Sequence, residues 1–236
     1  DKPIVNIDYA TDKVKLTAAN GEEFEADKVI VTVPIKILQG DMINFVPALP
    51  NDLNTAINSI FFGDGFKAFI EFKERFYPDV LLTDALLDPN SSDKIFYDAR
   101  LGKDTDKHVL GLFTIDDPAA TYAQLDTEQE ILDKILGELD EIYDGKASEN
   151  YVQHIFQNWS KEPYIQGSYT TSFQNDYNET LATLSAPLDN KVFFAGEATS
   201  LKGQAYVHGA LLSGIREALR FGANLDGIKG INKFRF

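Results

Sequence analysis

Short strand-forming segments dominate the chain, and they do not alternate regularly with helical segments. The first lies at Ile4–Tyr9, and turn signals such as Asn20-Gly21 separate the early ones. The β-branched run Lys28–Val33 stops at Pro34 and is typical of a strand buried on both faces of a sheet. Because strands outnumber helices without a repeating strand–helix order, the sequence predicts an α+β or mixed α/β fold.

Later strands are expected where apolar residues alternate or cluster. They are Ile43–Val46, Phe66–Phe72, Lys94–Asp98, Val109–Ile115, Tyr151–Trp159 and Val192–Ala195. A glycine-marked turn, Gly63-Asp-Gly65, precedes the second of these strands. A polar connection that contains glycine and proline leads from Trp159 to Pro187.

Three helices are expected. The clearest spans Thr127–Tyr143, where apolar residues recur at spacings of three and four and two glutamates occupy the first turn. Another covers Asp52–Ile60, with Asn51 or Asp52 as its N-cap. The last runs over Val207–Phe221 and stops at Gly222.

The charge balance excludes several classes of partner. The 236 residues include 22 Lys and Arg against 37 Asp and Glu, a formal charge of −15. Binding to nucleic acid phosphates or to anionic lipid needs a basic face, so neither nucleic acid nor membrane is expected as a partner. No apolar run reaches transmembrane length and the opening residues form no signal segment, so we expect a soluble protein, with the cytoplasm favoured. An acidic surface attracts cationic small molecules, although it more often serves solubility.

Cysteine is absent, which excludes disulfides, thiolate nucleophiles and cysteine-based metal sites. The three histidines, His108, His154 and His208, are far apart and match no metal-binding spacing. We therefore expect no metal.

Four segments carry a resemblance through their order and spacing. They are Ala26–Pro34; Ile43–Pro50 continuing to Gly65–Lys67; Trp159–Tyr169; and Phe194–Ser200 continuing to Ala205–Ala210. Together they resemble the C-terminal half of a flavin-containing amine oxidase, the family of monoamine and polyamine oxidases and the lysine-specific histone demethylase. The resemblance covers essentially the whole chain and implies FAD as cofactor and a small-molecule amine as substrate.

One family feature is missing. Members carry an N-terminal G-x-G-x-x-G that cradles the FAD pyrophosphate, whereas here Gly63-Asp-Gly65 precedes a strand. The chain begins with Asp1 and not with Met, so we expect a fragment, a dissected domain or one part of a split protein. Its partner would be the N-terminal FAD-binding half, and without that half the exposed sheet edges predict self-association.

The resemblance assigns five residues to cofactor binding. Gly196 and Glu197 end a buried strand and match residues that lie against the cofactor's ribose and phosphate region. Val207 begins a helix whose N-terminus suits the pyrimidine side of a reduced flavin. Ile4 matches a position near the adenine, and Trp159 a segment near the dimethylbenzene ring. The alternatives are a strand end with a polar turn and, for the helix, small residues that only permit close packing.

The resemblance also assigns three catalytic residues. Lys67 matches a lysine that holds a water against flavin N5, although a strand lysine more often points to solvent. Tyr169 and Tyr206 match an aromatic pair that flanks the substrate amine. Ser168 stands where monoamine oxidases carry a flavin-linked cysteine, so FAD would be held non-covalently. We interpret His208 as a solvated or hydrogen-bonded side chain and not as a catalytic one.

The expected organisation is a partial FAD-binding domain (residues 1–34), a sheet-based substrate domain (35–190), and the C-terminal strand and helix of the FAD-binding domain (191–236). The expected activity is oxidation of an amine or polyamine to an imine by hydride transfer to flavin N5, with O2 reduced to H2O2. The alternatives are another FAD oxidoreductase, such as a desaturase, or a non-catalytic module that needs a partner half.

Overall fold

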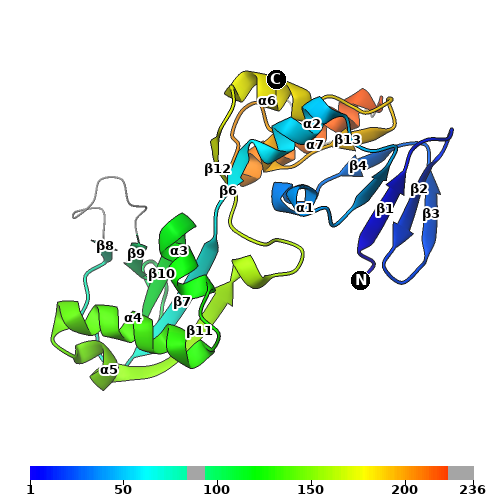
Figure 1. Ribbon diagram of the computed structural model, residues 1–236. Helices are drawn as coiled ribbons and strands as arrows, with labels where there is room; N and C mark the ends of the chain where they lie inside the picture. Colours follow the sequence, from blue (N-terminus) through cyan, green and yellow to red (C-terminus); the bar gives the residue numbers. More distant parts are fainter. Residues whose placement is uncertain (84–93, 223–236) are drawn as a thin grey trace. The chain divides into compact units, whose positions relative to one another are not determined.

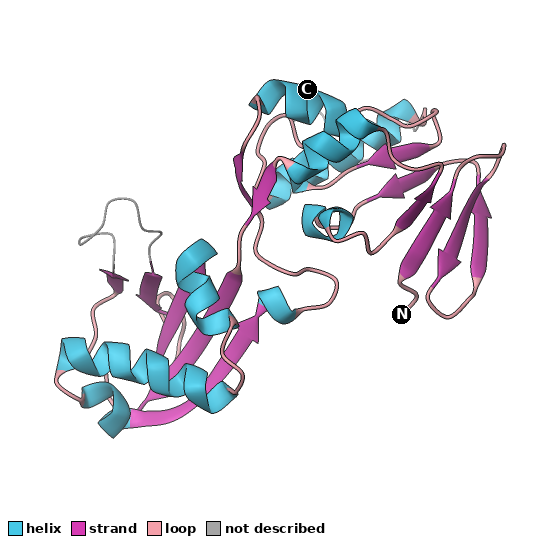
Figure 2. Cartoon of the chain, in the orientation of Figure 1, coloured by secondary structure: helices cyan, strands magenta, loops and turns pink. Residues whose placement is uncertain are grey.

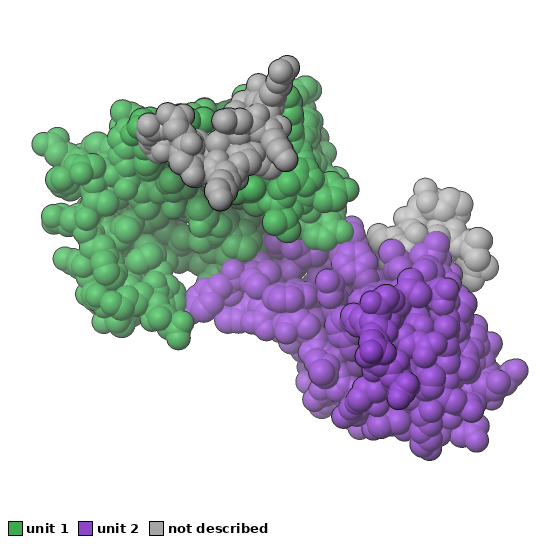
Figure 3. All heavy atoms as spheres, turned by 180° about the vertical axis from the view of Figure 1, so that it is seen from behind, with its two compact units in different colours: residues 1–61, 169–236 green, residues 62–168 purple. Residues whose placement is uncertain are grey.

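The computed structural model describes residues 1–83 and 94–222, and the chain forms two compact units. Unit 1 consists of residues 1–61 and 169–236, and unit 2 of residues 62–168 (Figure 3). Unit 2 lies inside the segment 35–190 that the sequence assigns to the substrate domain. The functional assignment of the three expected segments stays a prediction, and residues 223–236 of the last one lie outside the described residues.

The N-terminal part of unit 1 is a four-stranded sheet in the order β3-β2-β1-β5. Its strands are β1 (Ile4–Asp8), β2 (Val14–Ala18), β3 (Glu23–Ala26) and β5 (Asn44–Val46). The first three are antiparallel neighbours, as the short alternating segments predict, and β5 joins β1 in parallel. The buried side chains of Ile7 and Val14 lie on its covered face.

The rest of unit 1 is a small α/β arrangement (Figures 1 and 2). Strand β4 (Val29–Val31) pairs in parallel with β13 (Val192–Phe194), and β6 (Ile60–Phe62) pairs with β12 (Thr170–Phe173). The helices are α1 (Ile35–Gln39), α2 (Asn51–Asn58), α6 (Tyr177–Leu184), the 3-10 turn η2 (Glu197–Thr199) and α7 (Val207–Arg220). Residues far apart in the sequence therefore complete this unit.

Unit 2 is built on an antiparallel sheet in the order β11-β7-β10-β9-β8. The strands are β7 (Gly65–Phe72), β8 (Val80–Thr83), β9 (Lys94–Asp98), β10 (His108–Ile115) and β11 (Tyr151–Asn158). The alternation predicted for β7 is confirmed, because Phe66, Ala68, Ile70 and Phe72 are all buried while Phe69 is exposed. The covered face of this sheet is therefore set by the period-two pattern.

Helices α3 (Asp116–Ala123), α4 (Glu128–Tyr143) and α5 (Lys146–Asn150) complete unit 2, which ends with the 3-10 turn η1 (Trp159–Lys161). Apolar side chains of α3 and α4 pack on the buried side chains of the sheet to form one hydrophobic core. Each fully buried large side chain in such a core contributes roughly 1.5–3 kcal/mol of transfer free energy.

Helix α4 confirms the strongest helix prediction and shows why it begins where it does. The Thr127 side chain accepts from the Glu130 N–H, and the Glu130 carboxylate accepts from the Thr127 N–H at 3.0 Å. This capping box satisfies two main-chain donors that the helix itself cannot. The same bonds to Thr127 hold the pKa of the Glu130 carboxyl below its usual value.

Two other helix predictions need correction. Helix α2 runs over Asn51–Asn58, and neither Asn51 nor Asp52 caps it, because Pro50 occupies the N-cap position without a side-chain bond. Its end is earlier than predicted because Ile60 begins β6. The polar connection before Pro187 contains α6, which starts where Asp176 accepts from the Glu179 N–H.

Candidate functional site

Gly196 stands at the end of buried β13, where the main chain is open to close approach. Its φ of 139° lies in a region that favours glycine, and no atom lies within 4 Å of the position that a Cβ would take. The turn is fixed from behind by α7, since Gly196 N donates to Ser213 Oγ at 2.8 Å. Ser213 Oγ also lies 3.0 Å from Gly196 O.

The Glu197 carboxylate bonds to two other segments of unit 1. Oε1 accepts from the main-chain N–H of Thr170 at 3.2 Å and from Thr170 Oγ1 at 2.9 Å. Oε2 accepts from the Ala205 N–H at 2.7 Å. A carboxylate has about four acceptor positions, so three bonds leave capacity for a further donor.

Tyr169 and Tyr206 directly adjoin the two residues that Glu197 holds. Tyr206 is 63% exposed and stacks on His208, with ring centroids 5.2 Å apart. Tyr169 is half-buried at the start of the segment that leads into β12. The structure therefore brings Glu197 and the chain segments of both tyrosines together in unit 1.

The N-terminus of α7 follows directly. Val207 is 89% exposed, and no side chain caps this end of the helix. A Cβ on Gly209 would stand 1.7 Å from the Gly203 carbonyl oxygen, so this small residue permits close packing of the chain's own loop. His208 is exposed, as its interpretation as a solvated side chain predicts.

A buried ion cluster on α7 anchors the same turn, and the sequence interpretation missed it. Arg216 donates to the carbonyl oxygens of Thr199 at 2.7 Å and Phe194 at 2.8 Å. Glu217 is fully buried and pairs with both Arg216 and Arg220. The spacing of these three charges on one helix was the available signal, but only the fold shows that Glu217 is buried, with the part-buried Arg216 and the more exposed Arg220 paired to it.

Lys67 lies in β7 of unit 2, on the face opposite the hydrophobic core. It is half-buried, and its cross-strand neighbours are Phe113 on β10 and Gln157 on β11. Its Nζ lies 5.3 Å from the centroid of the Phe113 ring, a cation–π distance. The ammonium thus extends along the sheet surface and is not turned into the core.

The remaining two predicted residues lie in different units. Trp159 begins η1 in unit 2 and is half-buried, and its carbonyl oxygen accepts from the Gly167 N–H at 3.2 Å. Ile4 is the first residue of β1 in unit 1 and pairs with Ala18.

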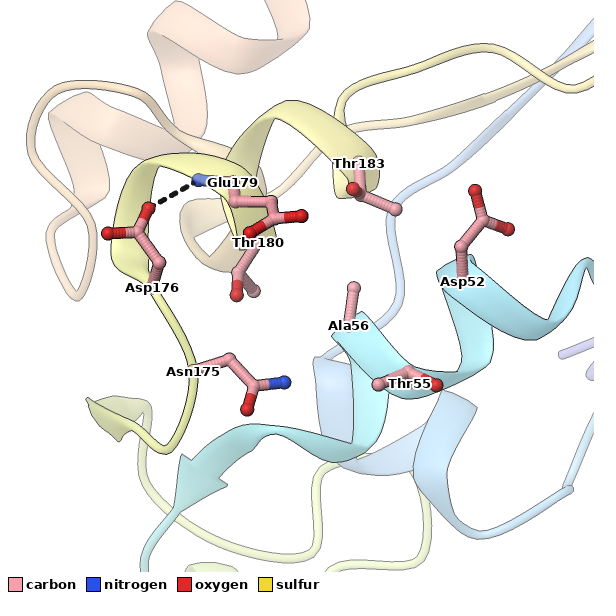
Figure 4. Close-up of a pocket in the computed structure, with 8 residues that line it drawn as sticks. All are labelled: Asp52, Thr55, Ala56, Asn175, Asp176, Glu179, Thr180 and Thr183. Atoms are coloured by element: carbon pink, nitrogen blue, oxygen red, sulfur yellow. Dashed lines mark hydrogen bonds between the residues drawn. The ribbon is translucent and has the colours of Figure 1, made fainter.

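A polar pocket of about 370 Å³ lies between α2 and α6 of unit 1 (Figure 4). It is lined by Asp52, Thr55, Ala56, Asn175, Asp176, Glu179, Thr180 and Thr183. None of the cofactor-binding or catalytic residues predicted from the sequence lines it. Within residues 1–83 and 94–222, no group of three or more histidine or acidic side chains is placed to hold a metal ion. Over the same residues, no helix has the length and apolarity needed to cross a bilayer.

The sequence profile of the family described as "Flavin containing amine oxidoreductase" matches residues 1–220. The chain belongs to this family. Mouse (Mus musculus) "Lysine-specific histone demethylase 1B" is 32% identical over 94% of this chain and 27% of its own length. "Polyamine oxidase 2" from Arabidopsis thaliana is 27% identical over 87% of this chain and 41% of its own length. The resemblance drawn from the four motifs is confirmed.

The fold of flavin-containing amine oxidoreductases is also found in solved structures. Wild-type putrescine oxidase bound to putrescine superposes with a TM-score of 0.74, at 21% identity, over 94% of this chain and 49% of that chain. The mixed α/β class is therefore confirmed. The chain spans between about a quarter and a half of the length of these relatives.

The residues present in unit 1 fit a flavin. The space at Gly196 and the uncapped start of α7 leave main-chain groups accessible. Two buried polar atoms, Thr171 Oγ1 and Gln204 Oε1, belong to residues two positions along the chain from the tyrosines and have no hydrogen-bond partner within the described part of the chain. Such atoms are rare in native proteins unless a ligand or water completes them, and the N–H and C=O groups of a flavin ring have the matching chemistry.

Proposed function

We propose that this chain forms part of an FAD-dependent oxidase of amines or polyamines. The observation that carries the proposal is the family match over residues 1–220, which spans both units. When bound, FAD supplies a two-electron acceptor that takes a hydride equivalent from the carbon next to nitrogen and transfers the electrons to O2, giving H2O2. The substrate becomes an imine, which water hydrolyses to a carbonyl compound and either ammonia, from a primary amine, or a shorter amine, from a secondary one.

In this proposal, Tyr169 and Tyr206 orient the substrate amine. Their rings would flank it and stabilise the positive charge that develops on nitrogen as the α-hydrogen leaves. The exposure of Tyr206 supports this role, because a ring that packed only into the core would not be available to a ligand. The formal charge of −15 favours a polycationic amine over a neutral or acidic substrate.

Lys67 would hold a water against the reactive edge of the flavin. Its position on the uncovered face of the sheet supports the role, because a lysine turned into the core could reach no ligand. The cation–π contact with Phe113 restricts the long side chain and so lowers the cost of ordering it.

Five residues would contact the cofactor: Gly196, Glu197, Val207, Ile4 and Trp159. FAD would be bound non-covalently, because the chain has no cysteine that could bond to the flavin. Ser168, at the corresponding position, instead donates its hydroxyl to the Gly63 carbonyl oxygen at 3.1 Å. The chain contains no G-x-G-x-x-G, and we propose that residues outside it complete the pyrophosphate site.

The first test is flavin retention. The chain is mixed with FAD and desalted, and the visible spectrum of the protein fraction is recorded; a band at about 450 nm marks bound flavin. Retention supports a cofactor site within these residues. A colourless fraction supports a site shared with residues outside the chain, and the activity test then uses the longer or two-part protein.

The second test is flavin reduction without oxygen. Putrescine, spermidine and a primary monoamine are compared with an apolar polyene, and bleaching of the flavin band by an amine alone supports the proposal.

Lys67→Met is expected to lower amine-dependent H2O2 production by about 100-fold, the effect typical of losing a proton-handling group. Lys107→Met is the matched control, because Lys107 pairs with Glu71 in the same sheet. Reduction by the polyene alone, or unchanged turnover in Lys67→Met, would overturn the corresponding assignment.

A further inference from the structure

Glu197 holds two chain segments that are distant in sequence and that each carry one of the proposed substrate tyrosines. Thr170, which follows Tyr169, donates two hydrogen bonds to Oε1, at 3.2 and 2.9 Å. Ala205, which precedes Tyr206, donates one to Oε2 at 2.7 Å. One carboxylate is thus the direct link between the two main-chain positions next to the rings.

Both held positions are constrained in ways that depend on this link. Thr170 is buried, so its main-chain N–H needs a protein acceptor, and Glu197 supplies it. Ala205 has a φ of 63°, in the left-handed region that non-glycine residues rarely adopt. The bond from Ala205 N–H to Glu197 stabilises that conformation, which sets the direction in which Tyr206 leaves the turn.

The carboxylate itself stands on a rigid base. Glu197 begins η2, whose preceding residue Gly196 is bonded to Ser213 of α7. Thr199, at the end of the same turn, accepts from the buried guanidinium of Arg216. Two bonds from α7 therefore flank Glu197 in the chain, and its position follows that of the helix.

We propose that Glu197 is a positioning residue that sets the separation and orientation of Tyr169 and Tyr206. The inference rests on the proposed function, because it matters for catalysis only if the two rings bind the amine. It adds to the expected contact with the cofactor a second role, carried by the bonds to Thr170 and Ala205. The carboxylate has acceptor capacity for both.

The glutamate carboxylate suits this link better than the side chain of glutamine or aspartate would. All three bonding groups are N–H or O–H donors, and an ionised carboxylate only accepts. In Glu197→Gln, the side-chain amide would turn an NH2 group toward at least one of the two segments, where it would face another donor. Glu197→Asp removes one methylene, so the shorter side chain cannot span both segments.

The link is tested first on this chain without flavin, by hydrogen exchange of the Thr170 and Ala205 amides. In Glu197→Gln, exchange at one or both positions is expected to accelerate at least about tenfold, because a main-chain bond is lost. Glu179→Gln is the control, since Glu179 lies in the α2–α6 pocket and contacts neither segment. Unchanged exchange at both amides would overturn the proposal, whatever the protein's activity.

The catalytic consequence is tested in the flavin-loaded protein that contains this chain. Flavin content is measured for each variant, and we expect Glu197→Gln to reduce the rate of anaerobic flavin reduction by amine, per bound flavin, about 10- to 100-fold, as misplacement of a reactant does. In a Tyr206→Ala background, Glu197→Gln should lower this rate by a smaller factor than it does in the unmodified protein, because part of its action passes through that ring. Glu179→Gln should leave both quantities unchanged.

The outcomes separate the two proposals. If no amine reduces flavin in the unmodified protein, the proposed function fails, and the tyrosine-positioning role fails with it, while hydrogen exchange still reports the link. If amines reduce the flavin, and reduce it at the same rate in the Glu197→Gln variant as in the unmodified protein, only the positioning role is wrong. A loss of flavin content without a change in amide exchange would assign Glu197 to the cofactor alone.

Discussion

The two units of this chain both bury apolar side chains, but they differ in how their chain segments are joined. Unit 2 is one continuous segment whose sheet and helices share a hydrophobic core of large apolar side chains. Unit 1 joins two distant segments, and its predicted functional turn is fixed by polar anchors: the Glu197 carboxylate, Ser213 and the buried Arg216–Glu217 pair. The turn at Gly196 and Glu197, which joins distant segments of unit 1, therefore depends on a few directional hydrogen bonds in addition to the apolar burial that both units share.

The largest expected effect is in unit 1. Glu217→Ala leaves Arg216 and Arg220 without their buried partner, which should cost about 3–5 kcal/mol of unfolding free energy. Hydrogen exchange in β13 should accelerate, while fluorescence of Trp159, the single tryptophan, should report an unchanged unit 2. Glu22→Ala, which breaks an exposed pair with Lys2, should cost less than about 1 kcal/mol. Equal effects of the two changes would refute the anchor role.

The next largest effect is expected in unit 2, from truncation of a buried apolar side chain. Ile135→Ala empties a fully buried position on α4 and should cost about 2–5 kcal/mol. Ile142→Ala, on the same helix but 46% exposed, should change stability by less than about 0.5 kcal/mol. Urea unfolding followed by Trp159 fluorescence measures both. If Ile135→Ala moved the β13 amides as much as the tryptophan, the two units would unfold together and the comparison would break.

A smaller effect concerns Tyr77, a buried hydroxyl in unit 2 with no hydrogen-bond partner in the described residues. Burial, with Asp98 nearby, raises the pKa of Tyr77 to about 12. Because the unfolded chain loses this proton near pH 10, the native state's preference for the neutral phenol stabilises it below that pH. That contribution is lost as pH rises from 10 to about 12.

Tyr77→Phe should therefore leave stability at pH 7 unchanged or raise it by up to about 1 kcal/mol. The variant should also lose less stability than the unmodified chain between about pH 9 and pH 11.5, measured by urea midpoints. Identical pH dependences would mean that the hydroxyl is solvated. In that case solvent would reach the Tyr77 hydroxyl, and the core of unit 2 would not be fully closed to water.

The smallest effect concerns association of the chain with itself, predicted from the sequence. Helix α7 exposes Val207, Leu211 and Leu219, spaced at four and eight along one side. We expect light scattering to show a mass above that of a monomer at high concentration. Replacing Leu211 and Leu219 together by Glu should weaken association about tenfold, whereas Leu101→Glu, an exposed loop position of unit 2, should not. A monomeric mass at every concentration would contradict the prediction that unit 1, and not unit 2, carries a self-association surface.

Local patterns predicted much of the fold. The capping box at Thr127 and the period-two alternation in β7 are short-range signals, and both lead to elements that the structure contains. Helix α6 escaped prediction because only Leu181 and Leu184 are its large buried apolar residues, although the Asp176–Glu179 spacing was a usable capping signal. Helix α3 escaped because Asp116, at its start, takes a left-handed conformation that no pattern marked.

The candidate site was predictable as a set of residues but not as a network. The motifs name Gly196, Glu197 and Tyr206, yet nothing local links Glu197 to Thr170, 27 residues earlier. Likewise, the sequence pattern does not distinguish Arg216 from a surface charge, whereas in the structure its guanidinium donates to the carbonyl oxygen of Phe194. Bonds between distant segments follow from tertiary packing, which a single sequence does not encode in any local pattern.

The division of unit 1 into two segments also governs the order in which the chain can fold during synthesis. Among residues 1–83 and 94–222, strand β4 pairs with β13 alone, from Val29 against Val192 onward, so this pair waits until nearly the whole described chain has been made. Unit 2 can close once residue 168 has left the ribosome, and its ends then meet where Ser168 N donates to Gly63 O at 2.8 Å. Since domains fold as units during translation, unit 2 can be complete before the β4–β13 pair of unit 1 is able to form.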